Sequence, residues 1–221
     1  MTTLLEVRRV LVERLVVGDF ASCAYVVAEG ENRECIVIDP GAEGGDLLKV
    51  IEKHNLTPKF IVNTHGHSDH IAANSFLKER FPELRICIHP EDAKMLKSTI
   101  KNLSLFFGRR VRSPSADRLL EEGDTLEIEG GSFKVLHIPG HTKGGIALLQ
   151  EAKQNDPAII FTGDTLFAGG IGRTDFPSGS QKVLIKAVKE KIMTLPDETI
   201  VYPGHGPPTT VGQERSDNPF L

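Results

Sequence analysis

Cysteine is scarce in this sequence of 221 residues, and tryptophan is absent from it. The three cysteines, Cys23, Cys35 and Cys87, are odd in number and stand singly between apolar neighbours, so they do not form a disulfide framework. None belongs to a pair of cysteines or to a larger Cys and His cluster that would complete a thiolate metal site. We therefore predict three reduced, buried thiols without a chemical role.

Long hydrophobic runs are also missing. At the N-terminus the charged residues Glu6, Arg8, Arg9, Glu13 and Arg14 interrupt every apolar stretch. This excludes a signal-peptide core and a segment long enough to span a bilayer. The sequence therefore predicts a cytoplasmic protein.

An excess of positive charge is lacking too, since the formal net charge is -4. Without a broad basic surface that could gather phosphates, nucleic acid and anionic membranes are poor candidates as partners. We expect a small-molecule substrate instead. The oligomeric state stays open.

Apolar residues are plentiful, at 39% of the chain, which is enough for one domain over residues 1–221. Strand-like runs, mostly bounded by Gly, Pro or Asp, occur at residues 9–17, 24–28, 35–38, 60–63, 84–88, 125–128, 133–137, 146–149, 158–161 and 199–202. Apolar residues at helical spacing predict helices at 46–54, 69–81, 90–96 and 181–193. This interleaving predicts an α/β (α+β) protein with mixed sheets covered by helices.

Residues 97–116 differ from the rest because Phe106 and Phe107 are followed by Gly108 and three arginines. The pattern indicates a helical excursion and then a loop. One interpretation is a lid whose arginines meet an anionic group of the substrate. We favour the other, a surface crossover whose phenylalanines dock on the core.

The densest cluster of metal-ligating residue types follows the strand-like residues 60–63. In the stretch 64–70, His65 and His67 alternate along an extended segment, and Asp69 and His70 open a helix. Such spacing lets two histidines converge on one point while the next pair points to a neighbouring one. The stretch therefore predicts two adjacent metal sites.

Three further candidate ligands each follow a strand-like run, with a glycine directly before them: His141, Asp164 and His205. Loops at one edge of the sheets could bring them together, and the glycines let the backbone approach a metal closely. The other histidines have no such partners. We predict that His54 and His89 lie at the surface. His137 is predicted at most to contact a metal ligand, without binding metal itself.

With these residues in place, the sequence resembles the metallo-β-lactamase superfamily. The resemblance implies a four-layer αββα sandwich, two mixed sheets flanked by helices, with a metal pair at one edge. It implies that His65, His67 and His141 hold one ion, that Asp69, His70 and His205 hold the other, and that Asp164 bridges them. The longer stretches 161–167 and 172–176 are similar to the glyoxalase II and persulfide dioxygenase branch, and the chain end resembles stand-alone bacterial glyoxalase II-like proteins.

The chain departs from full-length glyoxalase II in ways that concern the substrate. It stops roughly where the C-terminal glutathione-binding helical domain would begin, and Asp175 and Pro207 stand where the family has tyrosines. The basic residue of that region is kept as Arg173. We predict that Arg173 binds substrate by clamping a carboxylate, with anchoring of its own turn as the alternative.

Hydrolysis is the chemistry expected of this site. Two divalent ions can lower the pKa of a shared water to about 7, so a metal-bound hydroxide could attack a thioester such as S-lactoylglutathione. Asp69 would orient the hydroxide and accept its proton. A thiol with a pKa near ~8.5 can leave as thiolate without an added acid. Ligands of this kind accept zinc, iron or manganese.

Two alternatives stay open. His65, His141 and Asp164 would also make the triad of a mononuclear iron persulfide dioxygenase acting on glutathione persulfide. The chain could instead be a non-catalytic metal-binding protein that kept the fold. Retention of all seven ligand positions favours the hydrolase.

Overall fold

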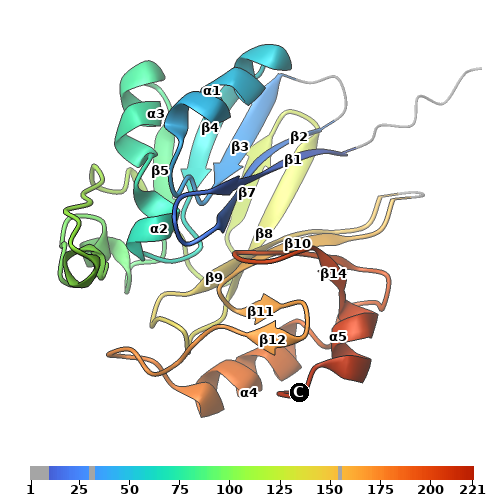
Figure 1. Ribbon diagram of the computed structural model, residues 1–221. Coiled ribbons are helices and arrows are strands. Elements are labelled where there is room, and N and C mark those ends of the chain that lie inside the picture. Colours follow the sequence, from blue (N-terminus) through green and yellow to red (C-terminus); the bar gives the residue numbers. More distant parts are fainter. Residues whose placement is uncertain (1–9, 30–32, 154–155) are drawn as a thin grey trace, which may run out of the picture.

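Two β-sheets lie face to face, and helices cover the outer face of each (Figure 1). The computed structural model describes residues 10–29, 33–153 and 156–221. The four-layer αββα arrangement confirms the fold that the family resemblance implied.

The first sheet has the strand order β1-β2-β3-β4-β5-β6. Its first three strands are antiparallel, and β3 to β6 are parallel, so the sheet is mixed. The strands are β1 (Val10–Val17), β2 (Ser22–Glu29), β3 (Glu34–Ile38), β4 (Thr57–Val62), β5 (Arg85–Ile88) and β6 (Arg118–Leu119).

The second sheet has the order β14-β13-β10-β9-β8-β7, with β10 and β13 parallel and the other neighbours antiparallel. Its strands are β7 (Thr125–Ile128), β8 (Gly131–His137), β9 (Ile146–Gln150), β10 (Ile159–Gly163), β13 (Ile200–Pro203) and β14 (Thr209–Thr210). A separate ribbon pairs β11 (Leu166–Phe167) with β12 (Gly170–Ile171).

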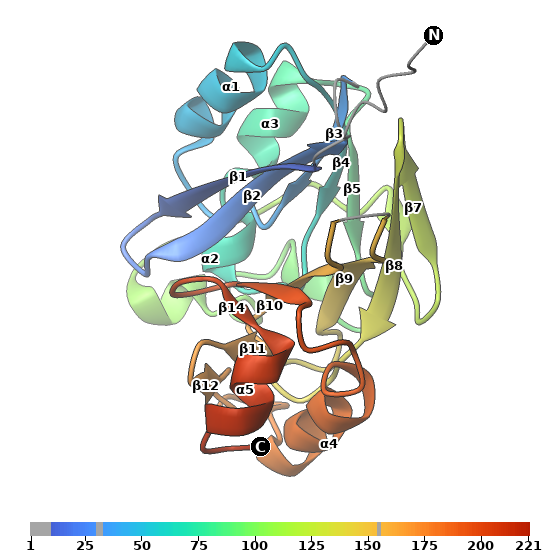
Figure 2. The same cartoon turned by 90° about the vertical axis from the view of Figure 1, so that its right-hand side faces the viewer.

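Helices form the two outer layers, as Figure 2 shows from the side. Next to the first sheet lie α1 (Gly44–Lys53), α2 (Ser68–Ile71) and α3 (Asn74–Arg80), and next to the second lie α4 (Gln181–Lys191) and α5 (Val211–Asp217). Strand β2 is buried on both faces. Tyr25 packs between the sheets, whereas the small residues Ala24 and Val26 face the helices.

Strand direction brings the candidate ligands to one edge of the sandwich. The parallel strands β3 and β4 end together, and β8, β10 and β13 also run in one direction, because β8 and β10 are both antiparallel to β9. Loops that follow the carboxyl ends of parallel strands meet at one edge of a sheet. All seven candidate ligands lie on such loops or directly after them.

All ten predicted strands are present within a few residues, although Arg9 lies outside the described part. The four strands β6, β11, β12 and β14 were not predicted, because two residues are too short to show an alternating pattern. Cys23, Cys35 and Cys87 are free and buried, as predicted.

The helix predictions need three corrections. The predicted helix at 69–81 is split into α2 and α3, because the chain turns at Ala73, whose amide donates to the Pro40 carbonyl at 2.9 Å. The predicted helix at 90–96 is only a 3-10 turn, Ala93–Met95. The predicted helical excursion in 97–116 consists of turns with one short 3-10 segment, Ser104–Phe107.

Candidate metal centre

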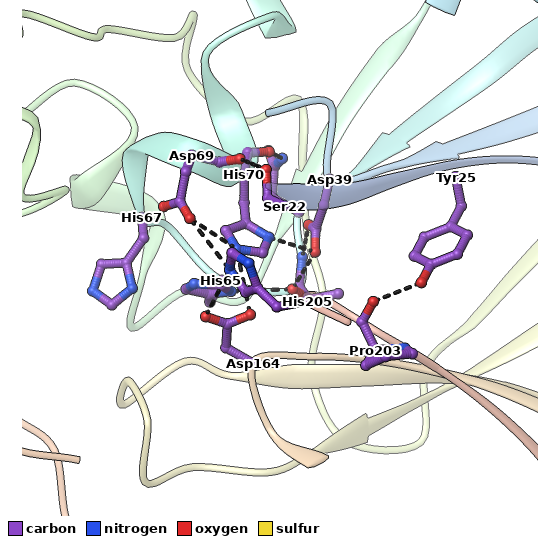
Figure 3. A network of polar contacts seen from close by, with 12 residues as sticks. Ser22, Tyr25, Asp39, His65, His67, Asp69, His70, Asp164, Pro203 and His205 are labelled. Carbon is purple, nitrogen blue, oxygen red and sulfur yellow. Dashed lines mark hydrogen bonds and ion pairs between the residues drawn. The ribbon is translucent and has the colours of Figure 1, made fainter. Parts of the chain in front are cut away.

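The predicted ligands converge at one edge of the sandwich, where loops from both sheets meet (Figure 3). The first sheet contributes the stretch after β4 together with α2, and the second contributes the loops after β8, β10 and β13. The structure brings together all seven predicted residues: His65, His67, Asp69, His70, His141, Asp164 and His205.

Three of the histidines form a first group at this edge. The ligand atoms of His65, His67 and His141 all lie within 4.8 Å of one another, and the three residues are buried. Nδ1 of His67 is 2.9 Å from Nε2 of His141. The group has nitrogen donors only.

A second group lies beside the first and mixes nitrogen with oxygen. Nε2 of His70 is 3.5 Å from a carboxylate oxygen of Asp69, and Nε2 of His205 is 3.4 Å from the same atom. Asp164 lies between the groups. Its carboxylate is 3.6 Å from His141 Nε2, 3.4 Å from His70 Nε2 and 3.5 Å from His205 Nε2.

The distances from the Asp69 and Asp164 carboxylates to the imidazole nitrogens fit coordination of cations better than direct bonding between the side chains. Two ligand atoms that each lie about 2.1 Å from a tetrahedral zinc ion are about 3.4 Å apart. The separations around Asp164 match that spacing and are too long for good hydrogen bonds. His65 Nε2, His70 Nε2 and Asp164 Oδ1 are also buried without a hydrogen-bond partner among the described residues. The cluster is therefore a metal-binding one.

Three of the five histidines of the cluster are oriented by a contact on the outer side of the ring. His70 Nδ1 contacts Asp39 Oδ2 at 3.0 Å, His65 Nδ1 contacts the Thr64 hydroxyl at 3.1 Å, and His141 Nδ1 contacts the Arg173 carbonyl at 2.7 Å. Such outer contacts fix the ring of a ligating histidine and leave Nε2 for the metal.

Asp39 was not among the residues predicted from the sequence. It follows β3 with a positive φ of 49°, and its carboxylate accepts hydrogen bonds from the Thr64 amide at 2.7 Å and the Thr64 hydroxyl at 2.6 Å. Asp39, His65 and His70 could also hold an ion by proximity. We assign Asp39 an orienting role instead, because its oxygens are already committed. The sequence signal that could have identified Asp39 is its position directly after a predicted strand whose end lies at the same edge.

Glycines allow the loops to approach each other closely. A Cβ atom at Gly204 would overlap Asp164 Oδ1, and one at Gly41 would overlap the Asp69 carbonyl. Gly163 adopts a φ of +49° and faces the Thr64 side chain without room for a Cβ. The glycines next to Asp164 and His205 therefore let two loops of the site approach each other, whereas the predicted close approach of the backbone to a metal stays a prediction.

Burial and charge act on the two groups in opposite ways. Burial lowers the pKa of His67 to about 3 and that of His65 well below its ordinary value, so both are neutral and ready to bind a metal. Burial also lowers the pKa of His205, but bonds to Asp164 and Asp69 outweigh it and raise this pKa to about 10.

The two carboxylates respond to the same neighbours. Burial raises their pKa values, but the charge of His70 and the contact with His205 outweigh it. The pKa of Asp69 is therefore below its ordinary value, and that of Asp164 is about 2. Both are ionised at neutral pH, and a metal would compete with protons for the nitrogens of His70 and His205.

A pocket of about 160 Å³ opens over the cluster, with Asp69 and His205 in its wall. Phe20 and Phe107 pack edge to face at 4.8 Å across its rim, and Arg109 pairs with Asp19 beside them. The predicted docking of the phenylalanines on the core is therefore wrong. Phe106 is 72% exposed and Phe107 is 47% exposed, and neither ring belongs to a hydrophobic core cluster of the described residues.

Arg173 also lies in the pocket wall. Its guanidinium donates to both oxygens of Asp175, at 2.8 and 2.7 Å, and stacks 3.8 Å from the Phe176 ring centre. Among the described residues, the Arg173 side chain therefore contacts the side chains of Asp175 and Phe176. Its backbone carbonyl contacts His141 and orients that ring.

The remaining histidines lie away from the cluster, and one prediction about them is wrong. His89 is 7% exposed, not at the surface, because its ring stacks on His137 at 4.1 Å. His54 is partly exposed and contacts Glu13. His137 contacts the Lys143 carbonyl and none of the seven ligands.

Comparison with known proteins agrees with the geometry. The family model of the metallo-beta-lactamase superfamily matches residues 17–205, a span that includes every candidate ligand. The chain belongs to the metallo-beta-lactamase superfamily. It is thus a member of a superfamily of metallo-hydrolases, and the predicted resemblance is confirmed.

Individual members of the superfamily are similar over most of the chain. Hydroxyacylglutathione hydrolase GloC from Haemophilus influenzae is 39% identical, with 86% of this chain and 89% of that protein covered. The crystal structure of BLEG-1 B3 metallo-beta-lactamase has a TM-score of 0.88 and 33% identity over 96% of this chain and 99% of that one. The protein TTHA1623 in a di-iron-bound form has a TM-score of 0.81 and 38% identity, with 95% and 100% covered.

Proposed function

We propose that this protein is a metal-dependent hydrolase that cleaves a small thioester, such as S-lactoylglutathione or a related acyl compound. Seven residues would hold two divalent ions. The proposed ligands are His65, His67 and His141 for one, Asp69, His70 and His205 for the other, and Asp164 between them. The observation that carries the proposal is the spacing of about 3.5 Å between Asp164 and three imidazole nitrogens.

Bound ions would supply Lewis acidity, which lowers the pKa of a water and polarises a carbonyl group. The residues of the chain would do the rest. Asp69 lies in the pocket wall and is ionised at neutral pH, so it can accept the proton of the attacking water. As the carbon–sulfur bond breaks, the thiol departs with the electron pair as thiolate, which needs no proton donor.

Arg173 is proposed to bind the substrate at the wall of the same pocket. Its side chain stacks on Phe176, which holds the guanidinium plane in place. A carboxylate of the substrate would have to exchange with Asp175 for this bidentate position. Arg173 is thus available only in competition with Asp175.

The relatives support both halves of the proposal. The name of the Haemophilus influenzae relative states hydrolysis of a hydroxyacylglutathione, which is a thioester. The relative TTHA1623 was solved in a di-iron-bound form, which supports two ions and iron as a candidate beside zinc and manganese. That the chain is one cytoplasmic domain remains a prediction.

The test combines metal analysis with turnover. The protein purified without added metal is assayed for metal content and for hydrolysis of a panel of acyl thioesters. We expect two metal equivalents per chain and an activity that His67→Ala lowers by at least roughly 100-fold, since even loss of an outer partner of a ligand costs about 10- to 100-fold. His54→Ala is the matched control, because His54 lies outside the cluster.

Other results would support other functions. One iron per chain, with oxygen uptake in the presence of glutathione persulfide, would identify the dioxygenase. Bound metal without turnover of any substrate would identify a non-catalytic metal protein. Hydrolysis no faster in the wild type than in His67→Ala would overturn the proposal.

A further inference from the structure

A second cavity continues from the active-site pocket. It has a volume of about 500 Å³ and shares three lining residues with the smaller pocket of about 160 Å³. The shared residues are His67, Leu103 and Phe176. The two hollows are therefore neighbours, separated by these three side chains.

The volumes of the two cavities indicate which part of a thioester substrate each cavity would hold. Small-molecule sites typically enclose about 300–1,000 Å³, so the smaller pocket can hold only part of a thioester. That pocket lies over the metal cluster and has Phe20, Leu103 and Phe107 in its wall, which suits an acyl group. The portion beyond the sulfur then extends into the larger cavity.

The larger cavity carries three lysines, Lys94, Lys101 and Lys143. All three are exposed, and in the part of the chain that the structure describes their ammonium groups have no hydrogen-bond or ion-pair partner. Two acidic residues also line it. Asp92 is 1% exposed and accepts from the Gly66 amide at 3.1 Å and the Gly144 amide at 2.9 Å, so only Glu91 opposes the lysines.

Apolar side chains also line the larger cavity. Ile100 is 60% exposed and Phe106 is 72% exposed, and both face the cavity together with Met95. Exposed apolar residues with a charged rim are typical of a ligand groove. A flexible chain with anionic ends would contact both kinds of surface.

We propose that this cavity, the Lys94–Lys101–Lys143 groove, binds the thiol portion of the substrate and selects a thiol that carries carboxylates or phosphates. The proposal rests on the thioester hydrolysis proposed above. It gives the site cations that are free to bind an anion, whereas Arg173 is already paired with Asp175.

The experiment compares three thioesters that share one acyl group, assayed with the metal-loaded protein. Their thiols are glutathione, with two carboxylates, coenzyme A, with phosphates, and neutral N-acetylcysteamine. The readout is the ratio of kcat/KM for each anionic thioester to that for the neutral one. The triple variant Lys94→Gln, Lys101→Gln, Lys143→Gln is compared with Lys97→Gln, an exposed lysine of the same segment that does not line the groove.

We expect the wild type to prefer at least one anionic thioester. A higher kcat/KM for the glutathione thioester would identify carboxylates as the bound groups, and a higher value for the coenzyme A thioester would identify phosphates. The preference of the triple variant should be about eightfold lower than that of the wild type, since each of three exposed pairs contributes about twofold. Added salt should weaken the preference in the wild type. Lys97→Gln should keep it.

The proposed role of the groove would be overturned if the wild type showed no preference for anionic thioesters, or if the triple variant kept that preference. The proposed thioester hydrolysis would not be affected by either result. A protein that hydrolyses none of the three thioesters would instead overturn the proposed function, and the groove with it. The charge reversal Lys101→Glu is a second test, because a lysine that only helps folding would lower all three rates equally.

Discussion

At the scale of single residues, Asp39 shows how a side chain outside the ligand set can control it. Its carboxylate joins His70 Nδ1 to the Thr64 hydroxyl, and Thr64 in turn contacts His65. One carboxylate thus sets the ring orientation of a ligand in each proposed ion site.

The variant Asp39→Asn tests this role. Asn tolerates the positive φ of this position, so the backbone should keep its path. An amide is a weaker acceptor for the His70 N–H, and we expect metal affinity to fall by roughly 10- to 100-fold. Competition with a chelator measures it.

The matched control is Asp46→Asn, an exposed carboxylate that contacts only Lys49 among the described side chains. Equal metal affinity in Asp39→Asn and the wild type would contradict the orienting role.

The sequence predicted which residues gather at the site better than it predicted the residues that orient them. Candidate ligands such as His65 and His141 can be recognised because a histidine beside a glycine recurs after predicted strands. Asp39 has a similar place, but its bond to His70 depends on how β3 and β4 pair, which no local pattern states. The burial of His89 likewise depends on His137, which is distant in sequence.

At the scale of elements, side-chain bonds add to the backbone pairing of the short edge strand β6. Only two residue pairs join β6 to β5. Asp117, directly before β6, accepts from the Ile86 amide at 2.8 Å and from Lys78 of α3 at 3.1 Å. One carboxylate thus joins a strand end, a neighbouring strand and a helix.

The pKa of Asp117 gives this contact a pH dependence. Burial raises this pKa, but the Ile86 amide and Lys78 outweigh it and hold it below its ordinary value of 3.8. A carboxyl with a lowered folded-state pKa contributes stability that is present above the unfolded pKa and is lost as the pH falls through the folded value.

We therefore expect Asp117→Asn to lower the melting temperature at neutral pH, by no more than about 2 °C because water screens the pair. The difference from the wild type should stay constant down to about pH 4 and shrink below it. Thermal scans from pH 7 to pH 3 measure it, with Asp46→Asn as control. A difference that grows toward acid pH would contradict the assignment.

Element boundaries were the weaker part of the prediction. Helix 181–193 was found because its apolar face recurs regularly, as in Leu184 and Val188. The split of 69–81 was missed because the turn is fixed by the distant Pro40 carbonyl. The segment 97–116 has few local signals, since its conformation follows from contacts such as Phe107 with Phe20.

At the scale of the whole molecule, direct bonds already join the two sheets at the metal edge. The Tyr25 hydroxyl of β2 donates to the Pro203 carbonyl of β13 at 2.6 Å (Figure 3), and the Cys23 amide donates to the Gly204 carbonyl at 2.7 Å. The sandwich therefore has contacts across this edge that do not depend on metal.

Removal of metal should consequently weaken the fold without abolishing it. Ions at a free concentration of 100 times their dissociation constant stabilise a folded protein by about 2.7 kcal/mol. For a chain of this size, that free energy corresponds to an increase of roughly 5–10 °C in melting temperature. We expect a chelator to lower the melting temperature by that amount, with the far-UV circular dichroism unchanged at 25 °C. His67→Ala should respond less. Loss of the helical signal on chelation would show that the described contacts across the edge are insufficient.

Fold class could be predicted from the sequence because strands and helices alternate along both sheets. The strand orders could not, since periodicity does not tell which strands become neighbours. The groove beside the site was also missed, because Lys94, Lys101 and Lys143 come from different turns that only the fold brings together.

The two sheets are formed from successive parts of the chain, since β6 ends at Leu119 and β7 begins at Thr125. A break of the backbone between these strands would yield two fragments, each with a complete set of strands for its sheet. Neither fragment could fill either proposed ion site, because His141, Asp164 and His205 would be in the second fragment and the other four ligands in the first. Retained metal would therefore report that the fragments had rejoined in their native arrangement.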